Sequence, residues 1–217
     1  MVEKEDRKSL RRERTRAEIL DATRSVVRRR GLAGFTLDDV AKQMGLTKAA
    51  LYYYFRSKDD LAFELLLEEW QLAAEAVAEA VQEAEDGARA LEALVKAYVG
   101  HFRDRPEMFL LTHAEIARAD TSHLVGQAQL ARIRPLNELF YGTIERKLQA
   151  DRAAGRVGRL DNPRRLAFVA QLAAVGLLTF KIMVEAVGDP LRYGDDELVE
   201  EINGLLRRAL PTPEGES

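Results

Sequence analysis

The sequence of 217 residues contains no cysteine, which excludes disulfide frameworks, thiolate metal sites and cysteine nucleophiles. Proline is scarce, with 6 residues, and no sustained alternation of β-branched residues indicates strands. The chain opens on charged residues instead of an apolar segment, which argues against a secretory signal. In the most apolar segment the uncharged run over residues 167–180 is too short to span a bilayer. We therefore expect a cytoplasmic protein without a membrane partner.

The groupings of side chains that catalysis and metal binding require are also missing. We find no nucleophile beside a base, no paired carboxylates and no glycine-rich loop for phosphate. The three histidines, His101, His113 and His123, are too far apart in the sequence to act as a ligand pair on one helix. The sequence therefore predicts neither an enzyme nor a metal centre, and it indicates no cofactor.

Charge is abundant but unevenly distributed along the chain. Residues 1–60 hold 15 lysines and arginines against 10 acidic residues, whereas the remainder holds 18 against 26. A basic N-terminal segment followed by an acidic remainder is typical of a polyanion-binding module attached to a domain that does not bind nucleic acid. A difference of this size also arises by chance, so the charge alone does not decide between the two interpretations.

Apolar residues recur at three- and four-residue spacings along the whole chain, which predicts an all-α protein. The predicted helices cover residues 10–30, 37–44, 48–54, 58–84, 88–104, 106–118, 122–154, 163–187 and 195–210. Gly31 is the expected C-cap of the first helix. Pro135 lies inside the seventh and should kink or divide it. The two ends, residues 1–8 and 211–217, are expected to be disordered.

Three helix starts follow one another between residues 35 and 60. Thr36 and Ser57 each precede an acidic residue three positions later, which is the pattern of a capping box, and Thr47 is a third N-cap. Gly45 lies between the first two helices and can adopt the positive φ of a tight turn. The predicted core of this unit consists of Val40, Ala41, Leu46 and Leu51. The spacing predicts a helix-turn-helix, whose second helix enters the major groove of DNA.

The second helix of this unit carries side chains suited to DNA. Thr47 and Lys48 are at its N-terminal end, which meets base edges in such units, and Tyr52, Tyr53 and Tyr54 follow. Tyrosine hydroxyls can donate to phosphate oxygens while the rings pack on sugars and thymine methyls. The alternative is that the tyrosines are core and rim aromatics. Lys58 is unfavourable in the first turn of a helix, and a nearby phosphate would explain its presence.

These segments together resemble the TetR family of regulators over about residues 12–65. The resemblance is carried by Phe35-Thr36, Asp39-Val40-Ala41, Gly45-Leu46-Thr47-Lys48, Leu51-Tyr52-Tyr53-Tyr54-Phe55 and Lys58-Asp59-Asp60-Leu61. It implies an all-helical homodimer that binds a palindromic DNA operator. It also implies phosphate contacts from Thr36, Tyr54 and Lys58, and groove contacts from Thr47, Lys48, Tyr52 and Tyr53. Ala50 departs from the family, whose members often carry Thr or Ser there, and it is not counted as a site residue.

A basic run precedes this unit. It consists of Lys4, Arg7, Lys8, Arg11, Arg12, Arg14 and Arg16. Such an arm can lie along phosphates or enter the minor groove. Acidic residues are interleaved with the basic ones, so a solvated tail fits the composition equally well. We predict a DNA-binding domain with this arm over residues 1–60, and a ligand-binding and dimerisation domain over residues 61–217.

The segment 163–187 is apolar almost all round and carries several small residues. A helix of this kind needs burial on every side. Together with the segment 195–210 it predicts a four-helix interface between two copies of the chain, with an ordinary intramolecular core as the alternative.

An effector pocket in the larger domain should be mostly apolar, with a few polar groups. The candidate ligand-binding residues are Met108, Phe109, Thr112, His113, Phe140, Tyr141, Gln171, Thr179 and Phe180. Any of them could equally be ordinary core. We expect a small, mostly hydrophobic effector, such as a fatty acyl or an aromatic compound.

The predicted function is that of a ligand-responsive transcription repressor. The helix over residues 57–84 would transmit a change on effector binding, so that the two recognition helices of a dimer no longer match successive major grooves. An activator of the same family and a helical protein-interaction module are the alternatives.

Overall fold

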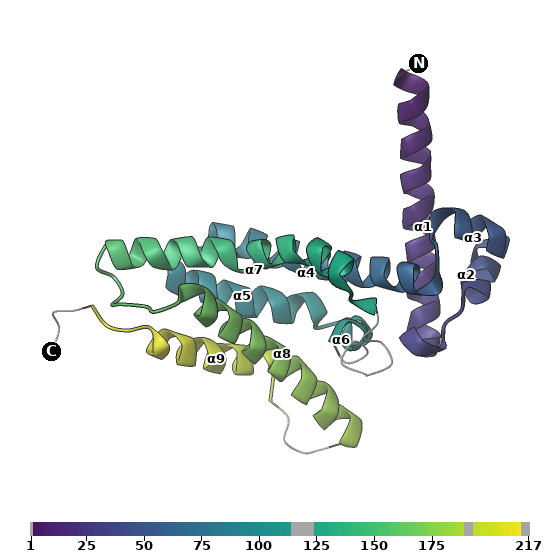
Figure 1. Cartoon of the computed structure of the whole chain (residues 1–217). Coiled ribbons are helices and arrows are strands. Elements are labelled where there is room, and N and C mark those ends of the chain that lie inside the picture. Colours follow the sequence, from purple (N-terminus) through teal and green to yellow (C-terminus); the bar gives the residue numbers. More distant parts are fainter. Residues whose placement is uncertain (1, 114–123, 189–192, 214–217) are drawn as a thin grey trace. The chain divides into compact units, whose positions relative to one another are not determined.

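The computed structural model describes residues 2–113, 124–188 and 193–213, with side chains from residue 7 onward. Every regular element among these residues is a helix, which confirms the all-α prediction. The helices are α1 (Val2–Gly34), α2 (Leu37–Met44), α3 (Lys48–Tyr54), α4 (Lys58–Glu83), α5 (Gly87–Phe102), α6 (Pro106–His113), α7 (Gln127–Ala153), α8 (Pro163–Val187) and α9 (Asp195–Ala209) (Figure 1).

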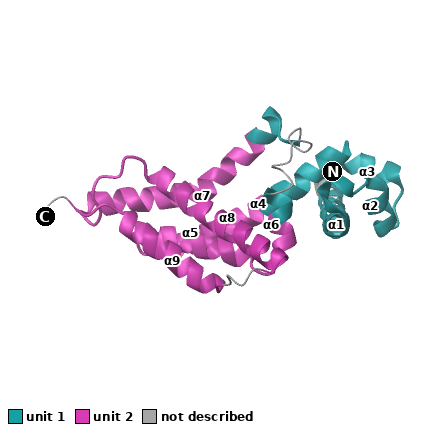
Figure 2. Cartoon of the chain, turned by 90° about the horizontal axis from the view of Figure 1, so that it is seen from below, with its two compact units in different colours: residues 1–69, 110–130 teal, residues 70–109, 131–217 magenta. Residues whose placement is uncertain are grey.

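The chain divides into two compact units. Unit 1 comprises residues 1–69 and 110–130, and unit 2 comprises residues 70–109 and 131–217 (Figure 2). The division falls within α4, whereas the predicted domain boundary after residue 60 lies near the start of that helix. α4 therefore contributes residues to both units.

α1 begins much earlier than predicted. It starts at Val2, so residues 2–8 are helical and not the disordered tail that we expected. Further along α1, side-chain pairs one turn apart stabilise the helix, as between Arg14 and Glu18, which are 3.1 Å apart. Gly31 has φ 73° and ψ 164°, which ends the regular part of the helix at the predicted residue, and a further turn extends to Gly34.

The predicted capping residues form the turns of unit 1. The Thr36 hydroxyl accepts a hydrogen bond from the backbone N–H of Asp39, and the Asp39 carboxylate accepts one from that of Thr36. Gly45 has φ 66° and ψ 25°, the left-handed conformation expected of the turn. The Thr47 hydroxyl accepts from Ala50 N–H at 3.2 Å. These local bonds define the helix-turn-helix.

The core of unit 1 includes three of the four residues predicted for it. Val40, Ala41 and Leu51 are buried, but Leu46 is exposed, which corrects the prediction. Leu46 follows the left-handed Gly45, and its N–H closes the turn onto the carbonyl of Ala41 at 2.9 Å. The side chain is thereby left at the rim of the turn. The rest of the core is built from Ile19, Val26, Phe35, Phe55, Leu61 and Leu65.

In unit 2, α5 packs against α8 and α9, and one face of α5 is buried along its whole length. α7 is continuous from Gln127 to Ala153, so Pro135 does not divide it. Pro135 is exposed, and water can therefore satisfy the carbonyl that its missing N–H leaves free. The bounds of α8 agree with the prediction, and those of α9 agree to within one residue. The predicted extensions of α6 to residue 118 and of α7 back to residue 122 fall partly outside the described residues.

Candidate nucleic-acid interface

The second helix of the helix-turn-helix, α3, presents polar and aromatic side chains to solvent. Thr47, Lys48, Tyr52 and Tyr53 are exposed, and Tyr54 is half-buried with its ring 5.0 Å from that of Tyr53 in an edge-to-face arrangement. Only Leu51 on this helix is fully buried. Because one buried apolar residue anchors α3, most of the side chains on this helix are exposed and can contact a partner.

Lys48 begins α3 and is held toward α2. Its Nζ lies 3.0 Å from an Asp38 carboxylate oxygen, and both side chains are about half exposed. This hydrogen bond raises the pKa of Lys48 above its usual value. The lysine is therefore charged at neutral pH, and its exposed carboxylate partner can be replaced by a phosphate at small cost.

Thr36 precedes α2, and Lys58 is the first residue of α4. Thr36 is exposed at the N-terminus of α2. Lys58 donates from Nζ to the carbonyl oxygen of Ala33 at 2.8 Å, and its Nζ is 4.9 Å from the centroid of the Phe35 ring. This carbonyl accounts for a lysine in the first turn of α4 without any phosphate. A nearby phosphate, which the sequence suggests as an explanation, is not required for this position.

Arg16 is a supporting residue that the sequence pattern did not single out from the basic run. Its Nη1 donates to the carbonyl oxygen of Tyr54 at 2.7 Å, and its guanidinium stacks 4.3 Å from the centroid of the Phe55 ring. A second guanidinium nitrogen is 3.5 Å from Glu64 on α4. Arg16 thus fixes the C-terminal end of α3 to α1 and α4. Only the fold reveals this, because its partners are about 40 or more residues away.

A cluster of charges joins α1 to α4. The guanidinium of Arg24 lies 2.7 Å from Glu69 and 2.7 Å from Glu68, and it also pairs with Asp21 on α1. Glu69 is fully buried, and burial raises the pKa of Glu68 above its usual value. Arg24 therefore compensates a carboxylate that is removed from water.

Four of the nine predicted ligand-binding residues belong to one aromatic cluster in unit 2. Phe140 and Tyr141 pack against each other at 5.9 Å, and the Tyr141 hydroxyl donates to Oε1 of Gln171. Phe109 joins the cluster through Phe102 and Tyr98, two residues absent from the prediction. Burial raises the pKa of Tyr141 to about 12, so its hydroxyl stays protonated and able to donate.

The other five predicted ligand residues lie elsewhere. Met108 is buried near the start of α6. Thr112 and His113 are in unit 1, where the Thr112 hydroxyl and Nδ1 of His113 are 2.9 Å apart. Thr179 and Phe180 are exposed on α8, and the Thr179 hydroxyl donates to the Val175 carbonyl oxygen. Among the residues that the structure describes, no group of three or more acidic or histidine side chains could hold a metal ion.

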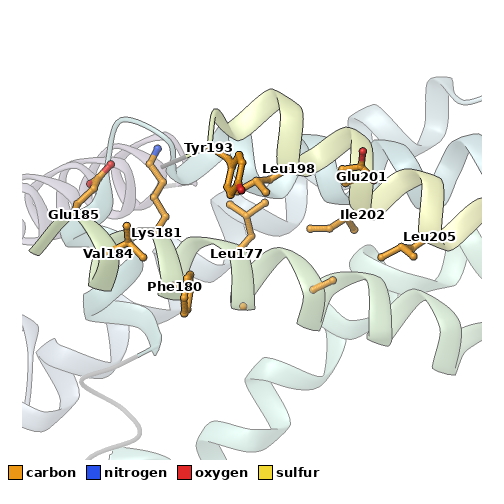
Figure 3. A pocket seen from close by; sticks show the side chains of 12 residues that line it. Leu177, Phe180, Lys181, Val184, Glu185, Tyr193, Leu198, Glu201, Ile202 and Leu205 are labelled. Carbon is orange, nitrogen blue, oxygen red and sulfur yellow. The ribbon is translucent and has the colours of Figure 1, made fainter. Parts of the chain in front are cut away.

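A large apolar surface lies on α8 and α9. Its most exposed members are Phe168, Val169, Leu172, Phe180, Met183, Val187 and Leu205. A groove of about 560 Å³ runs between the two helices, and Figure 3 shows Leu177 of α8 directed toward Leu198 of α9. Only 28% of the most apolar part of α8 is buried within the single chain, and by length and composition α8 could also cross a membrane. The helix is therefore not buried on every side by its own chain.

Residues 19–65 match the family described as bacterial regulatory proteins, tetR family. Two curated proteins of Pseudomonas putida are 40% identical to this chain over 52 residues, namely the HTH-type transcriptional regulator TtgR and the probable HTH-type transcriptional regulator ArpR. Each match covers 24% of this chain and 25% of the relative, so the chain aligns with about a quarter of these relatives.

Solved structures share the fold over nearly the whole chain. A protein of unknown function from Rhodococcus sp. RHA1 has a TM-score of 0.71 at 23% identity, and the match covers 91% of this chain and 95% of that one. The transcriptional regulator FadR from Bacillus subtilis, solved in complex with stearoyl-CoA, has a TM-score of 0.69 at 17% identity, with coverage of 88% and 96%. A regulator of the TetR/AcrR family from Thermobifida fusca YX-ER1 has a TM-score of 0.63 at 22% identity, with coverage of 90% and 97%.

The matched segment contains α2, α3, their caps and the start of α4, which are the elements that carried the resemblance in the sequence. The matched family is one of bacterial regulatory proteins, the class of protein that the sequence led us to expect. The helix-turn-helix segment of this chain is therefore similar to that of the tetR family of bacterial regulatory proteins.

Proposed function

We propose that the protein is a transcription regulator that binds a palindromic DNA operator as a homodimer. The proposal is carried by the surface of α3. This short helix has one buried residue, and its exposed side chains include a cation and tyrosine hydroxyls. In this proposal Thr47, Lys48, Tyr52 and Tyr53 contact the major groove. The phosphate contacts come from Thr36, Tyr54 and Lys58. DNA binding also implies that the protein acts in the cytoplasm.

Homodimerisation is supported by the apolar surface of α8 and α9. Exposed apolar patches of this kind mark interfaces in soluble proteins. A membrane span is the less suitable use of α8, because α5 and α9 already pack on it and Lys181 forms an ion pair of 2.7 Å with Asp195 beside the groove. A second copy would cover the remaining face with an identical one, giving a four-helix interface.

The proposed effector is a small, mostly hydrophobic molecule, and a long-chain fatty acyl compound is the first to test. The FadR structure of the same fold holds stearoyl-CoA. In this chain the aromatic cluster places apolar side chains beside the hydrogen-bonded pair of Tyr141 and Gln171, which is the mixture of groups that recognition of such a molecule requires. Met108, Thr112, His113, Thr179 and Phe180 stay predictions as ligand contacts.

We propose repression relieved by the effector as the mechanism. α4 contributes to both units, and the Arg24 cluster attaches its first part to α1. Effector binding would favour a conformation of the dimer in which the recognition helices no longer fit successive major grooves. By linkage, operator and effector then weaken each other's binding by the same factor.

The experiment that tests the proposal is selection of genomic fragments with the purified protein, followed by titration of the recovered site with and without stearoyl-CoA. We expect a palindrome, and weaker binding of it in the presence of the acyl compound. Recovery of no sequence would exclude the regulator and favour the helical interaction module. If the protein binds a palindrome with the same affinity in the presence of the compound, this effector is excluded, but the proposal of a transcription regulator stands.

A further inference from the structure

A second basic surface adjoins α3 within unit 1. A groove of about 780 Å³ lies between the N-terminal part of α1 and the C-terminal end of α3. From α1 it is lined by Lys8, Arg11, Arg12 and Thr15, which follow the spacing of one helical face. Met44, Leu46, Tyr53 and Tyr54 line the other side. We call this the arm groove.

The charges in the arm groove are available to a ligand. Lys8 and Arg11 are exposed, and neither forms an ion pair with the residues whose side chains are described. The guanidinium of Arg12 lies 5.6 Å from the centroid of the Tyr53 ring, which leaves its charge in the groove. Glu18 is the acidic residue of the lining, and it is paired with Arg14 at 3.1 Å. The groove therefore carries a net positive charge.

The arm groove is continuous with the surface proposed to read DNA, because Tyr53 and Tyr54 belong to both. The N-terminal end of α3 carries the residues that meet base edges, whereas the tyrosines lie at its C-terminal end. In addition, Arg16 holds that end to α1 through the Tyr54 carbonyl, which fixes the two walls of the groove relative to each other. A groove built in this way presents cations and tyrosine hydroxyls to a polyanionic strand.

We propose that the arm groove binds the phosphate backbone of the operator duplex outside the half-site that α3 reads. The N-terminal part of α1 is then a second DNA-contacting element, and its contribution is independent of base sequence. This proposal rests on the proposed operator binding, and it adds a set of contacts that the helix-turn-helix does not make.

The test compares Lys8→Ala/Arg11→Ala with Arg152→Ala on two operators. Arg152 is the control, because it is an exposed arginine at the end of α7 in unit 2 and does not line the groove. On an operator with about ten extra base pairs on each side, we expect the double variant to bind roughly tenfold more weakly at low salt. The slope of log affinity against log salt should fall by about one for each side chain removed. On an operator trimmed to its half-sites, the double variant and the wild-type chain should bind alike.

Equal affinity of the double variant and Arg152→Ala on the long operator would overturn the proposed role of the arm groove while leaving operator binding intact. A loss that persists on the trimmed operator would also overturn it, since the contacts would then lie within the half-site. Failure of the wild-type chain to bind any operator would remove both proposals. Circular dichroism of each variant distinguishes a lost contact from a lost fold.

Discussion

Polar side chains in the helix-turn-helix first serve to fix helix ends. Thr36, Thr47 and Ser57 each accept a hydrogen bond from a backbone N–H three residues later. These bonds satisfy donors that a helix leaves free, and they hold short helices that propensity alone would not stabilise. The same threonines are proposed DNA contacts, so a substitution can act through the fold or through the interface.

Replacing Thr36 with Ala should lower the free energy of unfolding by about 1 kcal/mol, because the cap of α2 is lost. The Thr36 hydrogen bond is also the main reason why the pKa of Asp39 is lowered, so that pKa should rise toward its ordinary value. Because the folded-state pKa of Asp39 is lowered, its contribution to stability is present above its unfolded-state pKa and is lost as the pH falls through its folded-state pKa. The free energy of unfolding of the variant should therefore fall less at acid pH than that of the wild-type chain. Urea unfolding between pH ~6 and ~3 measures both effects. Thr36→Ser keeps the cap, and an equal loss in that variant would contradict this account.

Between elements, single residues determine how closely helices approach. A side chain at Gly87, the first residue of α5, would come within 2.8 Å of the Cα of Leu148 on α7. The N–H of Gly87 also donates to the buried carboxylate of Asp151 at 2.7 Å. Glycine is therefore required by the contact between α5 and α7.

Replacing Gly87 with Ala should destabilise the protein by about 1–3 kcal/mol, since α5 and α7 must move apart. Gly100 is a matched control within α5, because a side chain there meets nothing within 4 Å. Gly100→Ala should be neutral or stabilising by up to about 1 kcal/mol. Thermal unfolding of both variants measures the difference, and equal stability would show that α5 and α7 adapt freely.

The Arg24 cluster leads to a second prediction, which concerns the contact between α1 and α4. Arg24→Ala removes an ion pair to the fully buried Glu69 and should destabilise unit 1 by about 3 kcal/mol. Arg14→Ala removes an exposed pair and should change stability by less than about 0.5 kcal/mol. Chemical unfolding compares the two variants. A small effect of Arg24→Ala would mean that α1 and α4 are held by their apolar contacts alone.

At the scale of the whole molecule, several large apolar side chains of α8 and α9 are exposed in the single chain, and apolar patches of this kind mark interfaces. Phe180, predicted as a ligand contact, is 53% exposed on this surface. It lines the groove between α8 and α9 together with apolar residues of both helices (Figure 3). Its place in the fold suits contact with a second copy better than contact with an enclosed effector.

Phe180→Glu should therefore convert a dimer into a folded monomer, because two carboxylates would enter an apolar interface. Operator affinity should fall by roughly a hundredfold or more, since two linked half-site contacts become independent. Analytical ultracentrifugation and operator titration measure these changes. Leu72→Glu, at an exposed position of α4, is the control and should alter neither property. A dimer that survives Phe180→Glu would place the interface elsewhere.

The helices, their caps and the helix-turn-helix can be predicted from the sequence, because these features depend on residues within a few positions of one another. Thr36, Gly45 and Thr47 are examples: each acts on its own turn, and each lies as predicted. The predictions at this local scale were wrong at the start of α1 and at Leu46, and Pro135 does not divide α7.

The tertiary structure decided everything that depends on residues far apart in the chain. It paired Lys58 with the carbonyl of Ala33 and Arg16 with that of Tyr54, and it gathered Phe140, Tyr141 and Gln171 into one cluster. It also placed Phe180 on the surface, although the apolar pattern of α8 is nearly uniform around the helix. Periodicity shows which residues avoid water, but only the packing of other helices against α8 decides which of its faces the chain itself can cover.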